Sequence, residues 1–301
     1  MLSLTLALLA LLLLPSCSPY RKGDTSTVMT VGNVAISAEL YSFVYEKNKD
    51  QYFGADADPA VLSASDRALL SDAVENELRN YAAIFIAAER FGVSLSSSDE
   101  EEIAALMKEK KEEFEDPDLF YEELENMHMT ENVLFGQCRN MALDSKLYEA
   151  RKPSINADLT PDRLLSDVRS YCYAAVQLLW SGRDAADALK RVEAGIRSVE
   201  DFYDAVARYS ADNDRGVRVC IVGEMLEPFE KAALALQPGQ ISGVVESSVG
   251  AHIILRVELT DDLIQQNLDD LREKDIVRIY REELRDAAQN AVVTYADGFR
   301  P

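Results

Sequence analysis

Few side chains in this sequence could carry acid, base, nucleophilic or metal chemistry. Two His and four Cys occur in 301 residues, at His128, His252, Cys17, Cys138, Cys172 and Cys220. They form neither a Cys-x-x-Cys nor a His-x-x-x-His pair, the spacings from which zinc sites are commonly built. We therefore expect no bound metal and no cofactor.

Cys17 directly follows a segment typical of an export signal. Residues 2–14 are an apolar run too short to cross a bilayer, which needs about 20 residues. The end of the segment, Leu14-Pro15-Ser16-Cys17, resembles the lipobox of bacterial lipoproteins. The resemblance implies a signal peptide at 1–16, a lipidated Cys17 and a tether at 17–27, on the extracytoplasmic side of a bacterial membrane. No Lys or Arg precedes the run, so an ordinary secretory peptide or a short core helix remains an alternative.

The other three cysteines, Cys138, Cys172 and Cys220, form an odd set. Export would place them in a compartment that can be oxidising, where at most one disulfide could form among three thiols. We expect all three to be small, buried, apolar groups, because a free Cys commonly packs in this way.

The net charge of −22, from 31 Lys and Arg against 53 Asp and Glu, limits the possible partners. A protein of this charge repels phosphate backbones, and no basic stripe offsets it, so we expect no nucleic-acid partner. Residues 99–125 alone hold thirteen Asp and Glu and three Lys. A solvated helix face is the simplest interpretation of this acidic block. The alternative is an acidic wall that keeps client chains soluble or binds divalent cations.

The hydrophobic pattern of the N-terminal half is mainly helical. Two short strands are predicted at 28–31 and 34–36, around a Gly-Asn turn. Helices follow from apolar residues at helical spacing, at 37–52, 65–91, within the acidic block and at 130–150. Residues 28–152 are therefore expected to form a helical lobe. The Pro-containing segment 153–170 is expected to be a linker.

After this segment the pattern changes to strands and short helices. Strands are predicted at 171–180, 217–222, 243–246 and 251–257, and helices at 183–194, 199–209 and 227–236. This order of elements indicates a compact α+β domain at 171–260. A helix at 262–289 and a strand at 291–295 complete the chain.

Four consecutive blocks between Tyr171 and Glu258 resemble parvulin-type peptidyl-prolyl isomerases. They are a Tyr-Ser-x-Asp end at Asp212, a block with Met225 and Phe229, a Leu-x-x-Gly-x-Ile-Ser block at 236–242, and a Gly-x-His-Ile-Ile block at His252. The blocks stand in the order of the family, which makes the resemblance specific. The segments 28–36 and 87–93 are also similar to exported foldases of the PrsA and SurA type.

The resemblance implies an α+β fold with two parts. The first is a mostly helical N-terminal chaperone-like lobe, completed by the helix and strand of residues 261–301, which pack back on it. The second is a small parvulin-like domain with a four-stranded antiparallel sheet.

The resemblance also implies the site residues. Met225 and Phe229 match the slot for the Pro ring, and Asp212 and His252 match the catalytic polar floor. The first His of the family is replaced by Gln177, whose amide can both donate and accept hydrogen bonds. The Gly-rich loop of the family is also degraded here, at residues 215–219.

Each of these residues has a purely structural alternative. His252 without its partner His could be a satisfied core residue, and Asp212 could cap the turn at 210–215. Met225 and Phe229 could be the core side of an amphipathic helix. His128, between two Met residues at a helix junction, is expected to be structural.

Two functions follow from this sequence. The first is an envelope-anchored peptidyl-prolyl cis-trans isomerase and foldase, with unfolded or partly folded exported polypeptides as partners and the membrane contacted through a lipid anchor. The second is a non-catalytic chaperone with a decayed parvulin domain, because Gln177 replaces the first His. A solute-binding lipoprotein is disfavoured, since it needs repeated βαβ units. The oligomeric state is left open.

Overall fold

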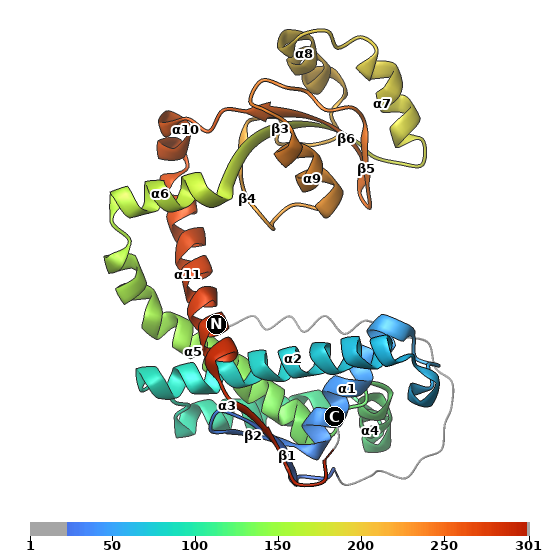
Figure 1. Cartoon of the computed structure of the whole chain (residues 1–301), viewed down its shortest axis with the longest axis vertical. Coiled ribbons are helices and arrows are strands. Elements are labelled where there is room, and N and C mark those ends of the chain that lie inside the picture. Colours follow the sequence, from blue (N-terminus) through green and yellow to red (C-terminus); the bar gives the residue numbers. More distant parts are fainter. Residues whose placement is uncertain (1–22, 300–301) are drawn as a thin grey trace. The chain divides into compact units, whose positions relative to one another are not determined.

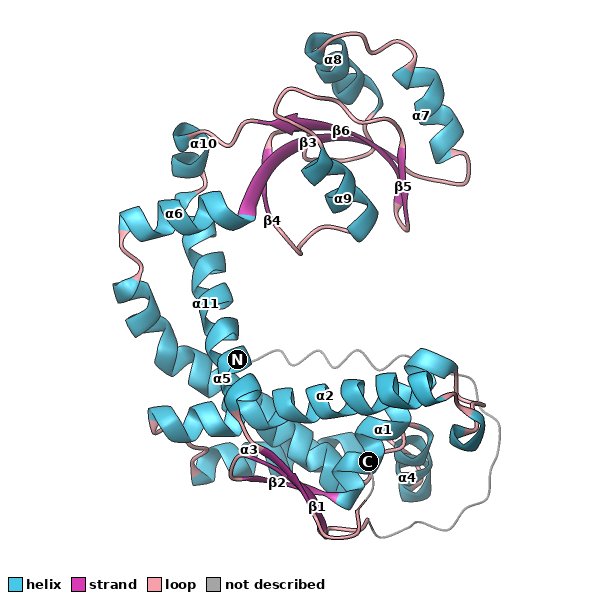
Figure 2. Ribbon diagram, viewed as in Figure 1, coloured by secondary structure: helices cyan, strands magenta, loops and turns pink. Residues whose placement is uncertain are grey.

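A computed structural model of the chain describes residues 23–299, so the expected signal peptide and Cys17 lie outside the described residues. The chain divides into two units. The first combines residues up to Ala150 with those from Glu283 onward, and the second spans Arg151–Glu282. The chain passes between them within α5 (Glu131–Asp158) and again within α11 (Leu268–Asn290). Figures 1 and 2 show that each unit has its own sheet.

The first unit contains a three-stranded antiparallel sheet in the order β2-β1-β7. β1 (Thr27–Val31) and β2 (Val34–Ser37) form the expected hairpin, and Gly32 in its turn has a φ of 58°. Gly adopts this left-handed backbone readily because it has no Cβ. β7 (Val293–Tyr295) pairs with the other edge of β1. The C-terminal strand therefore packs on the N-terminal lobe, as expected, and does so by completing its sheet.

Helices build the rest of the first unit. They are α1 (Ala38–Phe53), α2 (Ala64–Phe91), α3 (Ser97–Glu112), α4 (Pro117–Asn126), the first part of α5 and the last part of α11, with a short 3-10 helix at Pro59–Val61. Ser37, Ser63 and Ser96 begin three of them by accepting a hydrogen bond from a backbone N–H of the first turn. The acidic block forms two helices, because Asp116 caps a new helix that starts at Pro117.

The segment predicted to be a linker, residues 153–170, is helical instead. α5 continues past Pro153 to Asp158, and α6 spans Pro161–Tyr171. Pro161 stands in the first turn of α6, where the missing N–H costs no hydrogen bond. Ile155, Leu159, Leu164 and Val168 are all buried, so packing of apolar side chains holds the segment in place. The Pro residues predicted a non-helical segment, but the packing of these apolar side chains outweighs that local preference.

The C-terminal helix also differs from the prediction. It is interrupted at Asn267, which separates α10 (Asp261–Gln266) from α11. Residues 261–301 were expected to pack on the N-terminal lobe as one piece, but only those from Glu283 onward belong to the first unit. The preceding turns pack beside α6 in the second unit. Arg278 pairs there with Asp167 at 3.1 Å.

The second unit contains a four-stranded antiparallel sheet in the order β4-β3-β6-β5, as the α+β prediction required. Its strands are β3 (Cys172–Trp180), β4 (Arg218–Ile221), β5 (Val245–Ser247) and β6 (Gly250–Val257). The sheet has a hydrophobic core on each face. α7 (Ala185–Glu193) and α8 (Val199–Tyr209) cover one face, and α9 (Glu227–Ala235) covers the other.

The cysteines Cys138, Cys172 and Cys220 are free and buried, as predicted. Burial raises the pKa of all three thiols, because a thiolate loses its hydration there. Their role is therefore that of small apolar core groups. Within residues 23–299, no helix is long and apolar enough to cross a membrane.

The two-faced core of the second unit predicts unequal effects of two Leu→Ala changes. Leu189 in α7 is 0% exposed and Leu234 in α9 is 45% exposed. We expect Leu189→Ala to lower the free energy of unfolding of this unit by about 2–5 kcal/mol, because it leaves a cavity. Leu234→Ala should change it by less than about 1 kcal/mol. Trp180, the one Trp of the chain, lies in this unit, so urea unfolding followed by Trp fluorescence measures both. Equal effects would contradict the assignment of the core.

Candidate active site

Gln177 and His252 lie on the two central strands of the sheet in the second unit. In the register between β3 and β6, His252 is opposite Leu179 and Gln177 is opposite Ile254. Residues that pair in this way share a face of the sheet, so Gln177 lies diagonally next to His252. Ile254 packs in the cluster under α9, which identifies the face as the one that α9 covers.

A chain of hydrogen bonds connects four side chains on this face. Gln177 Nε2 donates to Asp212 Oδ2 at 2.5 Å, and His252 Nδ1 lies 2.9 Å from Gln177 Oε1. Asp212 as a carboxylate can only accept, so the amide oxygen of Gln177 must face His252 and accept from Nδ1–H. His252 Nε2 is then the unprotonated ring nitrogen. It accepts from the hydroxyl of Ser247 at 2.7 Å.

Arg218 forms an ion pair with Asp212, at the other end of this series of hydrogen bonds. Its Nη2 lies 3.0 Å from Asp212 Oδ2, and its Nε lies 2.9 Å from Asp214 Oδ2. Asp212 Oδ1 also accepts from the backbone N–H of Asp214 at 3.1 Å, so the carboxylate caps its own turn. Asp212 therefore caps its turn, as the structural interpretation expects, and its carboxylate also accepts from Gln177. Each oxygen of this carboxylate has a partner, which keeps the Gln177 amide in one orientation.

Ser247 and Arg218 were not identified from the sequence. Ser247 lies at the end of β5, and the β5–β6 hairpin folds it back over His252, which pairs with Val245. Arg218 lies in the segment that replaces the Gly-rich loop of the family, so no motif marked it. The only sequence signal for Arg218 was a positive charge six residues after Asp212. That the strand β4 brings Arg218 back to Asp212 is seen only in the structure.

Burial sets the protonation of His252. The side chain is 3% exposed, and desolvation lowers its pKa, while the nearby Asp212 carboxylate raises it by a smaller amount. The neutral ring is therefore the form present at pH 7, in agreement with the hydrogen bonds above. The unfolded chain takes up a proton at this position first as the pH falls, so His252 lowers stability below about pH 6.5.

Met225 and Phe229 differ in what they offer to a ligand. Phe229 in α9 is 3% exposed and packs edge-on against the His252 ring, with 5.4 Å between the ring centroids. Met225, in the turn before α9, is half-buried against the same cluster. Phe229 therefore packs against one side of the imidazole ring and is itself buried. Met225 is the one of the two that presents apolar surface to solvent.

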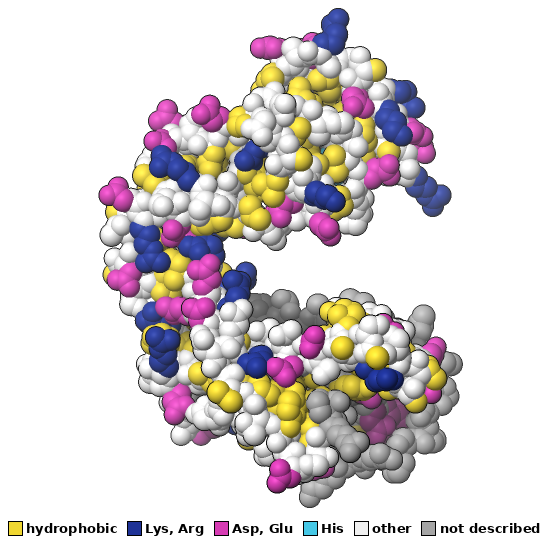
Figure 3. All heavy atoms as spheres, in the orientation of Figure 1, with side chains coloured by type: hydrophobic (Ala, Val, Ile, Leu, Met, Phe, Trp, Pro, Cys, Tyr) yellow, Lys and Arg dark blue, Asp and Glu magenta, His cyan; other side chains and the backbone are white. Residues whose placement is uncertain are grey.

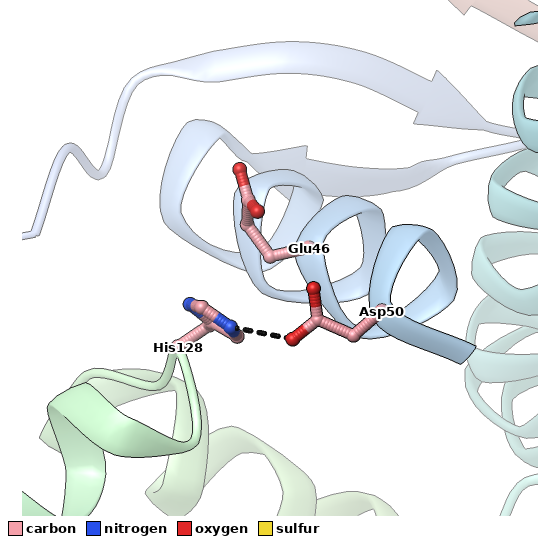
Figure 4. Close-up of side chains that lie close together, drawn as sticks. All are labelled: Glu46, Asp50 and His128. Carbon is pink, nitrogen blue, oxygen red and sulfur yellow. Dashed lines mark hydrogen bonds and ion pairs between the residues drawn. The ribbon is translucent and has the colours of Figure 1, made fainter. Parts of the chain in front are cut away.

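The other His of the chain takes part in a separate cluster in the first unit. Figure 4 shows His128 directed at Asp50 of α1, with Glu46 one turn earlier. His128 Nε2 lies 2.9 Å from Asp50 Oδ2. The ammonium group of Lys49 lies 2.5 Å from Glu46 and 3.4 Å from Asp50, so it already compensates both carboxylates. The cluster joins the turn at His128 to α1, which agrees with the structural role expected for His128.

Comparison with known sequences supports the interpretation of the second unit. Residues 181–258 match the model of the family described as Rotamase: PPIC-type PPIASE domain. Over 33 residues the chain is 70% identical to peptidyl-prolyl cis-trans isomerase pin1 of Schizosaccharomyces pombe, covering 11% of this chain and 19% of that protein. Over 120 residues it is 30% identical to foldase protein PrsA of Halalkalibacterium halodurans, covering 38% of this chain and 35% of that protein. The chain thus spans about a third or less of the length of these relatives.

Solved structures of foldases are also similar to this chain. PrsA from Bacillus anthracis is 21% identical with a TM-score of 0.31, and the match covers 71% of this chain and 96% of that one. PrsA from Bacillus subtilis is 17% identical with a TM-score of 0.29, covering 92% and 96%. TM-scores of this size do not bear on the fold. The family match and the sheet of the second unit together show that this chain carries a parvulin-type peptidyl-prolyl isomerase domain.

Such a domain accelerates rotation about the bond before Pro. The barrier is about 18–20 kcal/mol because the C–N bond is partly double, and no bond has to be broken. A catalyst needs an apolar surface for the ring and a dry, preorganised polar site that favours the twisted, less charge-separated imide. In this unit Met225 is half-buried and presents apolar surface, and His252 and Gln177 are held in fixed orientations by their hydrogen bond.

The hydrogen-bond chain predicts the state of the His252 ring. In the full chain carrying His128→Ala, His252 is the only imidazole, and its ¹⁵N signals should show the Nδ1–H tautomer. We expect it to titrate below pH 6.5, and Asp212→Asn should lower the midpoint further, because the carboxylate favours the protonated ring. NMR measurement over pH 4–8 tests this. An Nε2–H tautomer, or a midpoint above 6.5, would contradict the arrangement.

Proposed function

We propose that this protein is a parvulin-type peptidyl-prolyl cis-trans isomerase that assists the folding of exported polypeptides. The main support is the continuous hydrogen-bond chain from Ser247 through His252 and Gln177 to Asp212. Gln177 replaces the first His of the family but still donates on one side and accepts on the other. The polar floor therefore remains connected without the second imidazole. Identity to enzymes named peptidyl-prolyl isomerase supports the same reaction.

The second candidate is a chaperone with the same fold that has lost most of its isomerase activity. Two observations favour it. Gln177 cannot titrate, so a site that needs two imidazoles is incomplete. His252 and Phe229 are each 3% exposed, so a substrate would contact mainly the half-buried Met225 and Gln177. The two candidates differ in whether an X-Pro substrate is turned over.

An isomerase exchange assay on the full chain separates the two candidates. We expect the wild type to accelerate cis-trans exchange of an X-Pro peptide, and His252→Ala to lower kcat/KM by about tenfold or more, because the oriented polar group is lost. Met225→Ala should act mainly by raising KM, because it removes apolar binding surface. His128→Ala is the matched control, since His128 lies in the other unit, and it should retain full activity.

The same assay identifies a decayed site. If the wild type exchanges the peptide at the uncatalysed rate and Gln177→His restores catalysis, the isomerase proposal is wrong and the chaperone candidate stands. If both proteins are inactive while circular dichroism shows a native fold, the isomerase proposal is equally wrong. Activity in the wild type that His252→Ala abolishes supports the proposal.

We further propose that the protein is held in the bacterial envelope by a lipid on Cys17. The support is the apolar run at 2–14 followed by Leu14-Pro15-Ser16-Cys17, and two relatives are named foldase protein PrsA. Anchoring would hold the isomerase domain on the extracytoplasmic side, where exported chains emerge unfolded. More than one acyl chain is needed for stable attachment.

Cys17→Ser tests the anchor. We expect the wild type to fractionate with membranes and to be released by detergent but not by high salt, because attachment is hydrophobic. Cys17→Ser should lose the lipid and, where the signal is still cleaved, appear in the soluble fraction. Cys138→Ser is the matched control, because that thiol is buried in the first unit. A processed Cys17→Ser protein that stays with the membrane would refute the lipid anchor.

A further inference from the structure

A groove lined by apolar side chains lies between α3 and α5 in the first unit. Its volume is about 430 Å³. Ile103 and Cys138 are buried at its base, where they join a small hydrophobic cluster shared by the two helices. Leu106 and Met141 line the groove above them, and Met141 is 44% exposed. Apolar surface presented to solvent in a concave site is characteristic of a site that binds another molecule.

The rim of this groove is acidic. Asp99, Glu102 and Glu149 line it together with a single cation, Lys146. Lys146 forms an ion pair with Asp99, which leaves no positive charge in the lining uncompensated. Among residues 23–299, neither the Glu102 nor the Glu149 side chain takes part in an ion pair or hydrogen bond. Two carboxylates therefore remain unpaired beside the apolar floor.

Cations close to the groove are neutralised in the same way. Arg139, two residues before Met141 on α5, pairs with Glu100 of α3 at 2.7 Å. On the face of the molecule drawn in Figure 3, Lys and Arg side chains likewise lie among Asp and Glu rather than in a patch of their own. With a net charge of −22, a ligand that supplies positive charge is favoured at this groove, and a second copy of this chain is disfavoured.

We propose that this groove binds segments of other polypeptides in which apolar residues are flanked by Lys or Arg. The apolar side chains would occupy the floor between Leu106 and Met141. The flanking cations would pair with Glu102 and Glu149, which adds selectivity and faster association. The proposal goes beyond isomerisation, because every lining residue belongs to the first unit and none to the Gln177–His252 site. The anionic rim also excludes acidic segments and anionic lipid surfaces.

Peptide binding to the full chain tests the proposal. Two fluorescein-labelled peptides share one Leu-Phe-Leu core, flanked in one by Lys and Arg and in the other by Glu. Fluorescence anisotropy should show binding of the basic peptide at least about tenfold tighter than that of its acidic twin, with the difference shrinking at high salt. The double variant Glu102→Gln/Glu149→Gln should weaken basic-peptide binding by about fivefold.

Matched variants separate the groove from overall charge and from folding. Glu109→Gln/Glu122→Gln changes the net charge by the same amount on exposed residues outside the groove and should leave binding unchanged. Met141→Asn should weaken binding, whereas Leu119→Asn, on the exposed face of α4, should not. Equal affinity for both peptides, or equal loss in the two double variants, would overturn the proposal. Isomerase activity measured on the same samples shows whether the proposed function fails independently.

Discussion

The antiparallel pairing of β3 with β6 is the interaction on which the second unit depends. These two strands form the centre of the four-stranded sheet, and each core of the unit packs on one of their faces. Their register also places Gln177 diagonally next to His252. A slip of either strand by one residue would turn its own site residue toward α7 and α8 and bring a core residue into the site. Folding of this unit and assembly of its site are therefore one event.

The polar chain within this site shows how a substitution can preserve a network. A buried imidazole without partners would cost free energy, and the carboxylate, the amide and the hydroxyl around His252 prevent this cost. Arg218 fixes Asp212, Asp212 fixes the orientation of Gln177, and Gln177 fixes the tautomer of His252. Because Gln177 does not titrate, within the bonded pair of Gln177 and His252 only the imidazole can change its charge. The site is thus a set of preorganised dipoles, the property that an isomerase requires.

The first unit is constrained by a contact between the ends of the chain. β7 pairs with β1 across more than 260 residues, and Tyr295 donates from its hydroxyl to Glu75 of α2 at 2.9 Å. This sheet is therefore completed only after the second unit has been synthesised, and closing such long loops slows folding. The helical lobe that presents the acidic groove and the parvulin-type domain are consequently parts of one folding process, although each has its own core.

Several parts of this protein were predictable because their signals are local. Period-two and helical patterns, Ser caps and Gly turns predicted the strands and helices of both units, and motif order predicted the parvulin-type domain. The linker at 153–170 was predicted wrongly, because Pro153 and Pro161 are local signals and the burial of Leu164 and Val168 is not. The division of the C-terminal helix between the two units was also missed, because it depends on tertiary contacts and not on a local sequence signal.

The sequence by itself determined most of the strands and helices, the residue types of the site and the charge, since these follow from the order of residues along the chain. Only the tertiary structure decided the partners: Ser247 with His252, Arg218 with Asp212, and the unpaired Glu102 and Glu149 above an apolar floor. Hydrogen bonds and ion pairs act over a few ångströms between residues far apart in sequence. Strand register and helix packing set those distances, and neither is written in any short stretch of residues.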